Sequence, residues 1–303
     1  MTTTSATIQE FMNRELIQIT NNRGQGRVYK SELSPYPLWS VTTILSMVNK
    51  PVLAAWKVRK TLEYVRDTLN IHGAGSASYI SADAKTKMLL EARDIPNVVA
   101  SAAAAVGTAA HNIIDQHISH GRPLWQDNLP LLHLDADSVR LVDNCISGFE
   151  KFCQEFEPTF LASEFGISSI HHGYAGTVDA LAKVGGKHVV IDFKTGSGIY
   201  DEAGLQLASY VEALSFPLQE WLGFPLNEPF DTWEEMEAWV VRLDKTKPNT
   251  YEIRKVANGP QAFNAFLGAL QLFKALGYPG ISKTLRKDLR DNHGLTIEDS
   301  SIW

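Results

Sequence analysis

The sequence predicts an α/β fold in which helices come first and a central mixed β-sheet flanked by helices follows. Two observations predict it. Apolar residues recur at helical spacing up to Glu157 of the 303-residue chain, and from Thr159 onward the pattern changes to that of short strands. No internal repeat or low-complexity tract interrupts this order, and the length suffices for one large domain with a helical elaboration.

The N-terminal part is predicted to be a polar lead-in followed by helices. Residues 1–35 are polar at first and then broken by an Asn- and Gly-rich run at 21–26, which is typical of a loosely held segment. Within 36–130, helical spacing predicts a helix over Pro51–Leu69, and an alanine-rich stretch predicts another over Asp83–Ile118. We expect little chemistry in the lead-in.

The segment 131–280 is predicted to hold the sheet. A helix over Asp135–Glu157 presents an apolar stripe. The elements predicted after it are strands over Thr159–Ile170, Ala175–Val184 and His188–Lys194, a helix over Asp201–Leu214, strands over Ala238–Leu243 and Thr250–Val256, and a helix over Pro260–Leu276. Gly185-Gly186 is the signature of a two-residue hairpin. Residues 281–303 form a C-terminal tail.

Charge and composition restrict the class of protein. With 44% hydrophobic and 20% charged residues the chain has a globular composition, and its formal net charge of -6 lacks the basic excess that is usual in nucleic-acid-binding domains. Any DNA contact must come from local clusters such as Lys57, Arg59 and Lys60, although such a cluster is more often a solvated face.

Membrane segments and disulfides are not expected. The chain has no run of about 18 uncharged apolar residues, and its N-terminus lacks the layout of a signal peptide. Its only cysteines, Cys145 and Cys153, lie about two turns apart in a predicted helix and cannot bridge each other. These features predict a cytoplasmic protein with reduced thiols.

Three polar residues on the predicted hairpin form the strongest candidate site. Residues two apart in a strand share a face, so Asp192 and Lys194 point together to one side. Pairing outward from the Gly-Gly turn sets Ile191 opposite Ala180 and therefore Asp192 opposite Asp179. The apolar neighbours of Asp179, Val178 and Ala180, are expected to face the core.

Two carboxylates at that spacing repel each other unless a cation lies between them. A hard divalent ion such as Mg²⁺ or Mn²⁺ is the natural solution. Glu164 on the preceding strand is a candidate third oxygen ligand or water-orienting group, and Lys194 is placed to assist an attacking water or to stabilise phosphate charge. Taken singly, an Asp and a Lys at a strand end are most often a solvated ion pair. Their joint occurrence with Asp179 favours function.

These residues lie within a wider series of motifs. The segments in order are Gly176-Thr177-Val178-Asp179, Asp192-Phe193-Lys194-Thr195-Gly196 and Gln206 to Tyr210. The series resembles the G-x-x-D, D-x-K-T-G and Q-x-x-x-Y motifs of RecB-like exonucleases of the PD-(D/E)XK superfamily. Upstream, Gly107 to His111 is similar to the G-x-x-x-H motif of that family, and Leu161 to Glu164 to its first acidic strand. The likeness extends over about residues 100–256, and Ser40–Trp56 also resembles the leading helix of phage-type members.

The resemblance implies a restriction-endonuclease-like core and a role for each matching residue. Asp179, Asp192, His111 and the backbone carbonyl of Phe193 would bind metal, and Lys194 would be the catalytic lysine. Gln206 and Tyr210, four apart on one helical face, would orient Lys194 or a DNA phosphate. The alternative for His111 is a hydrogen-bonded histidine on a partly buried helix, which is the less favoured of the two interpretations.

The function implied by the resemblance is Mg²⁺- or Mn²⁺-dependent hydrolysis of DNA phosphodiester bonds. An exonuclease acting on linear, possibly single-stranded DNA in phage-type replication, recombination or repair is expected, with a single-strand-binding or recombination protein as a possible partner. The alternatives are a structure-specific or restriction-like endonuclease and a non-catalytic nucleic-acid-binding or assembly protein. Two cysteines cannot hold a four-Cys iron-sulfur cluster, and no Walker loop for ATP is present.

Overall fold

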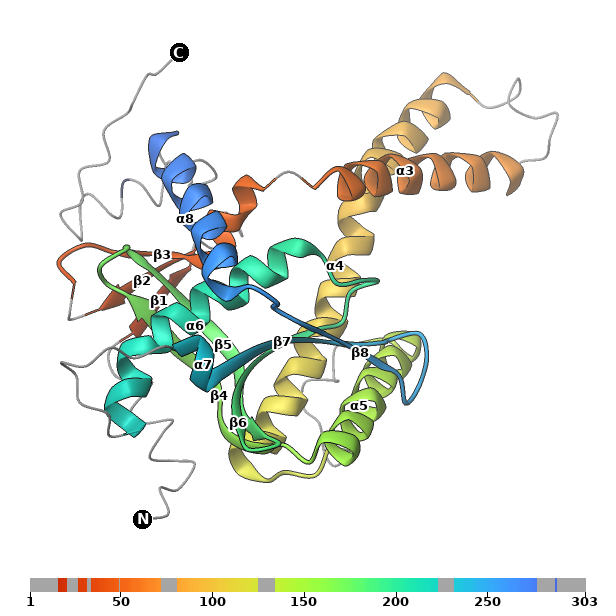
Figure 1. The fold of residues 1–303 in the computed structure, drawn as a ribbon. Helices are drawn as coiled ribbons and strands as arrows, with labels where there is room; N and C mark the ends of the chain where they lie inside the picture. Colours follow the sequence, from red (N-terminus) through yellow and green to blue (C-terminus); the bar gives the residue numbers. More distant parts are fainter. Residues whose placement is uncertain are drawn as a thin grey trace.

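The chain is an α/β protein built on a mixed β-sheet with helices on both faces (Figure 1). A computed structural model describes residues 16–20, 27–31, 34–48, 50–71, 81–124, 134–222, 232–276 and 287. Residues 1–15 and 21–26 of the predicted lead-in, and the predicted C-terminal tail apart from Lys287, lie outside the described residues.

The sheet has eight strands, and two of its neighbouring pairs are parallel. The strands are β1 (Leu16–Thr20), β2 (Arg27–Ser31), β3 (Leu38–Ser40), β4 (Thr159–Ser169), β5 (Tyr174–Val184), β6 (Lys187–Lys194), β7 (Met236–Leu243) and β8 (Tyr251–Lys255). Their order is β1-β2-β3-β5-β6-β7-β8, with β4 paired to β5. The pairs β3/β5 and β6/β7 are parallel and the others are antiparallel.

Helices cover the sheet in two layers. They are α2 (Val41–Ile44), the 3-10 helix η1 (Leu45–Met47), α3 (Pro51–Ile71), α4 (Ala82–His120), α5 (Ala136–Phe156), α6 (Asp201–Leu222), α7 (Thr232–Glu235) and α8 (Gly259–Ala275). Buried residues of α2, α6 and α8 form one core with one face of the sheet, and those of α4 and α5 form a second core with the other face. We call these the α6 face and the α5 face.

Strand β6 shows how the sequence divides between the two cores. Val189, Ile191 and Phe193 pack on the α5 face and Val190 packs on the α6 face, so the predicted alternation is confirmed. Asp192 and Lys194 lie two and four residues after Val190, so their side chains point to the same side of β6 as that of Val190. The helical and strand assignments from residue 51 to 276 are likewise confirmed, with ends shifted by a few residues and α6 extended to Leu222. The short α7 was not predicted.

The prediction of a loosely held lead-in is wrong for its described part. β1 and β2 lie within residues 1–35, and β3 lies in the region predicted to be helical. Val28, Tyr29 and Leu38 are buried, and β3 pairs with β5 at Tyr174 and Ala175. β1 and β2 pair with near neighbours, but β3 joins them to the sheet through β5, more than 130 residues away, and a local pattern does not reveal that partner.

Helix α4 is the one described helix that is long and apolar enough to cross a membrane by length and composition alone, which is weak evidence. Its second half belongs to the core, since Val106, Ala110, Ile113 and Ile114 pack on the α5 face. Its first half projects away from the sheet together with α3 (Figure 1).

Candidate metal centre

The candidate site lies where β5 changes partners. One edge of β5 pairs with β4 from Tyr174 to Lys183. The other edge pairs with β3 at Tyr174 and Ala175 and with β6 from Ala180 to Val184. Residues 176–179 therefore have no strand partner on that edge among the described residues, and at this opening in the sheet the Asp179 side chain meets His111 of α4.

In both β4 and β5 the alternation of side chains between the two faces of the sheet is broken, and the breaks lie beside each other. Glu164 on β4 has a left-handed backbone with a φ of 46°, and Ala162 and Phe165, three residues apart, both pack on the α6 face. On β5, Val178 packs on the α6 face and Ala180 on the α5 face. Val178 and Ala180 both face the core, as expected, but they do so on opposite faces of the sheet, because the alternation of side chains is interrupted between them.

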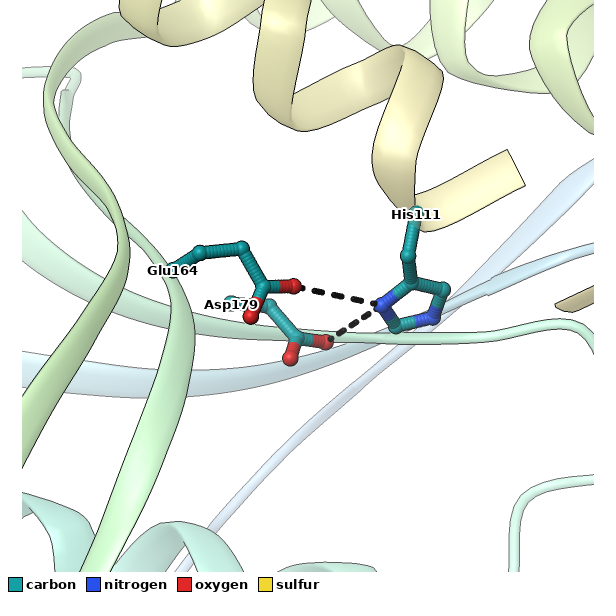
Figure 2. A group of neighbouring side chains, drawn as sticks. All are labelled: His111, Glu164 and Asp179. Atoms are coloured by element: carbon teal, nitrogen blue, oxygen red, sulfur yellow. Dashed lines mark ion pairs between the residues drawn. The ribbon is translucent and has the colours of Figure 1, made fainter. Parts of the chain in front are cut away.

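His111, Glu164 and Asp179 converge from three elements (Figure 2). His111 Nδ1 on α4 lies 3.6 Å from Asp179 Oδ2 and 3.8 Å from Glu164 Oε1. One ligand atom of each residue lies within 4.8 Å of those of the other two. These separations are longer than hydrogen bonds and are those of ion pairs, so the imidazole of His111 pairs with both carboxylates. We call these three residues the open group.

The charges in the open group perturb one another. Burial lowers the pKa of His111, but the negative charges of Asp179, Glu164 and Asp192 outweigh it and raise the pKa to about 9. Burial raises the pKa of Asp179, and the nearby cations His111 and Lys194 oppose that rise. Without another cation, the imidazolium of His111 balances the carboxylates.

Asp192, Lys194, Gln206 and Tyr210 form a second, hydrogen-bonded group, which we call the network. Lys194 Nζ donates to Asp192 Oδ1 at 2.8 Å and to Gln206 Oε1 at 3.3 Å. Gln206 Nε2 lies within 3.1 Å of Asp192 Oδ1 and donates to Tyr210 Oη at 3.0 Å. Gln206 is thus hydrogen-bonded to each of the other three residues of the network.

One oxygen of the network is engaged by an ion pair alone. Asp192 is 1% exposed, and its Oδ2 lies 2.8 Å from Lys194 Nζ without accepting a hydrogen bond from the described residues. Burial raises the pKa of Asp192 to about 6, against the opposing charge of Lys194. Burial lowers the pKa of Lys194, but the charges of Asp192 and Asp179 raise it above its ordinary value, so the ammonium is charged at neutral pH.

The two groups meet across the predicted hairpin. Gly185 and Gly186 have φ of 56° and 88°, as a two-residue turn requires, and Ala180 pairs with Ile191 as predicted. The backbone pairing of β5 with β6 ends at that pair. Beyond it, Asp179 Oδ2 accepts a hydrogen bond of 2.7 Å from Phe193 N, so a side chain and not the backbone bonds this amide. Asp179 therefore links the open group to the strand that carries Asp192 and Lys194.

At two glycines of the motifs, a side chain would come too close to a neighbouring residue. A Cβ on Gly176 would lie 2.6 Å from Tyr210 Cε1, and one on Gly107 would lie 2.9 Å from Thr195 Oγ1. Gly176 lets the Tyr210 ring pass close to β5, and Gly107 lets α4 approach the end of β6. The glycines of these motifs thus bring the helices to the site.

Every predicted site residue lies in the described part of the chain, but the residues are divided between the open group and the network. His111 and Asp179 lie together, as the resemblance implies, and Glu164 joins them. Asp192 faces Lys194 and Gln206 instead. The Phe193 amide contacts Asp179, and the ligand role of its carbonyl stays a prediction.

Two site contacts were missed because their residues lie outside the motifs. Tyr29 Oη of β2 lies 3.2 Å from Thr177 Oγ1, beside the opening in β5. Lys50, just before α3, forms an ion pair of 2.8 Å with Glu202 in the first turn of α6. The apolar pair Val28-Tyr29 within the N-terminal segment is the sequence signal that could have identified the first contact, since both residues are buried.

The donors fit a hard or borderline divalent cation. Carboxylate oxygens suit Mg²⁺ and Mn²⁺, and an imidazole nitrogen shifts the preference toward transition metals. The ligand atoms of His111, Glu164 and Asp179 lie close enough together for one cation to contact all three. Neither the family models nor the curated proteins with which we compared the chain gave a match.

Proposed function

We propose that this chain is a metal-dependent DNA nuclease with a restriction-endonuclease-like core of the PD-(D/E)XK type. The observation that carries the proposal is the convergence of the open group with a buried Asp192–Lys194 pair at an opening in the sheet. A structural ion pair needs only one carboxylate for one lysine. Here Lys194 pairs with Asp192, and two further carboxylates pair with His111 in the adjoining open group, a combination that suits a cation and an anionic substrate.

The open group, with Asp192, would hold Mg²⁺ or Mn²⁺. When bound, the ion supplies Lewis-acid polarisation of a phosphate oxygen. The carboxylates of Asp179 and Glu164 also fix the imidazole of His111, which must lose its proton to act as a ligand.

Lys194 would act on the phosphate. Its side chain is 35% exposed, although its ammonium is bonded to buried Asp192. A charged ammonium fixed in this way stabilises the negative charge that grows on phosphorus-bound oxygens during hydrolysis. Gln206 holds the ammonium in place, and Tyr210 holds Gln206. Both are therefore positioning residues.

Action on DNA ends is the narrower part of the proposal and is supported by the resemblance. An exonuclease on linear, possibly single-stranded DNA, delivered by a single-strand-binding or recombination protein, agrees with the net charge of -6, since an acidic chain binds duplex weakly by itself. An endonuclease would use the same strands and is distinguished only by its substrate.

The proposal is tested with end-labelled single- and double-stranded linear DNA and a closed circle, in EDTA, Mg²⁺ or Mn²⁺. Lys194→Ala and Asp192→Ala remove the chemistry, and Lys183→Ala, an exposed lysine near the hairpin turn, is the matched control. We expect metal-dependent shortening of the linear substrates by the wild type and by Lys183→Ala only. Cutting of the circle would make the protein an endonuclease. Absence of cleavage with either metal would contradict the proposal and favour a binding protein.

A further inference from the structure

The loop that follows Lys194 leads directly into α6 and is held in place at both ends. Thr195 at its start lies beside α4, where the motif glycine of that helix makes room for it. Ile199 near its end packs on the α6 face. The backbone carbonyl of Tyr200 then accepts a hydrogen bond of 3.0 Å from Ala203 N in the first turn of α6. The loop therefore presents its remaining side chains in a fixed position next to the network.

Tyr200 presents an aromatic ring to solvent at the end of this loop. The residue is 45% exposed, and its Oη lies 3.3 Å from Ser197 Oγ of the same loop, which directs the ring. Among the aromatic residues that the structure describes, Tyr36 is the other one with comparable exposure. An exposed aromatic ring beside a site for phosphate chemistry is suited to stacking on an unpaired base.

Lys50 brings a second positive charge to the start of α6. Its Nζ lies 2.8 Å from Glu202 Oε1. Glu202 and Gln206 are four residues apart and share one face of α6, and Gln206 accepts a hydrogen bond from Lys194 Nζ. Burial raises the pKa of Glu202, but the hydrogen bond from Lys50 and the charges of both lysines lower it below its ordinary value. Lys50 and Lys194 therefore lie near the same carboxylate.

The ion pair of Lys50 with Glu202 is of a kind that exchanges its partner easily. The two side chains are 42% and 24% exposed, and water screens an ion pair at such a position, so the pair contributes little to stability. A DNA phosphate carries a negative charge that can replace the carboxylate. Lys194, by contrast, is bonded to both Asp192 and Gln206 and stays in place. Lys50 is thus the lysine that is available for a phosphate beside the site.

We propose that Tyr200 and Lys50 form a nucleotide subsite at the start of α6, in which Tyr200 stacks on a base and Lys50 contacts a phosphate of the same strand. A base must be unpaired to stack on a side chain in this way, so the subsite takes single-stranded DNA. The inference rests on the proposed function, because the strand held here is the one that reaches Lys194. Both residues determine specificity and neither takes part in the hydrolysis.

Fluorescence anisotropy in EDTA with two labelled strands of equal length tests the stacking contact without cleavage. One strand is an oligothymidylate, and the other has the same phosphates but abasic sugars. The wild type should bind the oligothymidylate more tightly. Tyr200→Ala should bind it about 5- to 150-fold more weakly, the effect of losing one stacked base, and should bind the abasic strand like the wild type. Tyr200→Phe should keep the preference, as should the matched control Tyr36→Ala, an exposed tyrosine before β3.

The phosphate contact has a different signature in the same assay. Lys50→Gln should weaken binding of both strands by the same factor. It should also make the slope of log affinity against log salt shallower by about 0.7, which corresponds to one lost phosphate contact on a single strand. Lys183→Gln, an exposed lysine near the hairpin turn, is the matched control and should leave the slope unchanged. Circular dichroism of each variant should match the wild type.

Three results would overturn the subsite. They are a wild type that does not prefer the oligothymidylate, a Tyr200→Ala variant that keeps the preference, and a Lys50→Gln variant with an unchanged salt slope. If the wild type nevertheless cleaves DNA with Mg²⁺ or Mn²⁺, the nuclease proposal stands and the subsite alone is wrong. If the expected signatures appear but no metal supports cleavage, the subsite stands and the protein binds single strands without hydrolysing them.

Discussion

The open group and the network lie side by side and are held together in opposite ways. His111, Glu164 and Asp179 face one another at 3.6 and 3.8 Å without hydrogen bonds between them, whereas Lys194, Asp192, Gln206 and Tyr210 are joined by bonds of 2.8 to 3.3 Å. In the open group, the ligand atoms of the three residues point toward one another. The network satisfies its own members and fixes one ammonium.

This difference separates two tasks. Residues that bind a cation must keep lone pairs available, and residues that position a charged group must surround it. If the comparison holds, substitutions in the open group change metal binding and activity together, and substitutions of Lys194, Gln206 or Tyr210 in the network change activity with metal binding preserved.

The largest effects should come from removing one charged residue of each group. Asp179→Ala should abolish both Mn²⁺ binding and DNA cleavage. Lys194→Ala should slow cleavage about 100- to 1000-fold, the usual effect of losing a group that stabilises transition-state charge, while Mn²⁺ remains bound. Cleavage rates together with calorimetric Mn²⁺ titrations measure both. Loss of Mn²⁺ binding in Lys194→Ala would break the division between the groups.

Replacement of His111 should change the choice of metal. The imidazole is the only nitrogen donor of the open group, so His111→Ala should lower affinity for Mn²⁺ at least about 10-fold and affect Mg²⁺ less. Activity measured across a titration of each metal gives the two affinities. Equal loss with both metals would mean that His111 only orients the carboxylates.

A backbone contact next to the network should be sensitive to a single methyl group. Gly176→Ala forces a Cβ against the Tyr210 ring and should destabilise the protein by about 1–3 kcal/mol, as overpacking does. Gly204→Ala on α6, where a Cβ meets nothing within 4 Å, should instead stabilise by about 0.5–1 kcal/mol. Urea denaturation measures both. Similar stabilities for the two variants would show that Tyr210 is free to move.

The smallest effect concerns pH in the absence of metal. The pKa of Asp192 is raised from 3.8 to about 6 in the folded chain, so its contribution to stability is full below 3.8 and is lost as pH rises through 6. The Asp192→Asn side chain does not ionise, so the variant keeps its stability as the pH rises. Between about pH 5 and pH 8 the variant should gain roughly 1 kcal/mol relative to wild type, measured by urea denaturation in EDTA. Parallel pH profiles would show that Lys194 fully compensates the buried charge.

Local patterns predicted the elements that carry the site. The Gly-Gly turn fixed the hairpin register, so the pairing of Ala180 with Ile191 and the shared face of Asp192 and Lys194 followed from the sequence. Helical spacing likewise placed α4 and α6, which supply His111 and Gln206.

The features that the sequence did not reveal depend on contacts between distant segments. The opening in β5 exists because β3 and β6 pair with different parts of one edge, and β3 lies in a region without a strand pattern. The grouping of Glu164 with His111, separate from Asp192, follows from the left-handed backbone at Glu164, which alternation does not predict. Neither is visible in a window of local residues.

The central claim is that the open group binds a divalent cation. Electron paramagnetic resonance of free Mn²⁺ during titration into metal-free protein tests it most directly, with the wild type and Asp179→Ala compared. The account predicts that the wild type removes the free Mn²⁺ signal at micromolar to millimolar concentrations and that Asp179→Ala does not. Equal signals from the two proteins would contradict it.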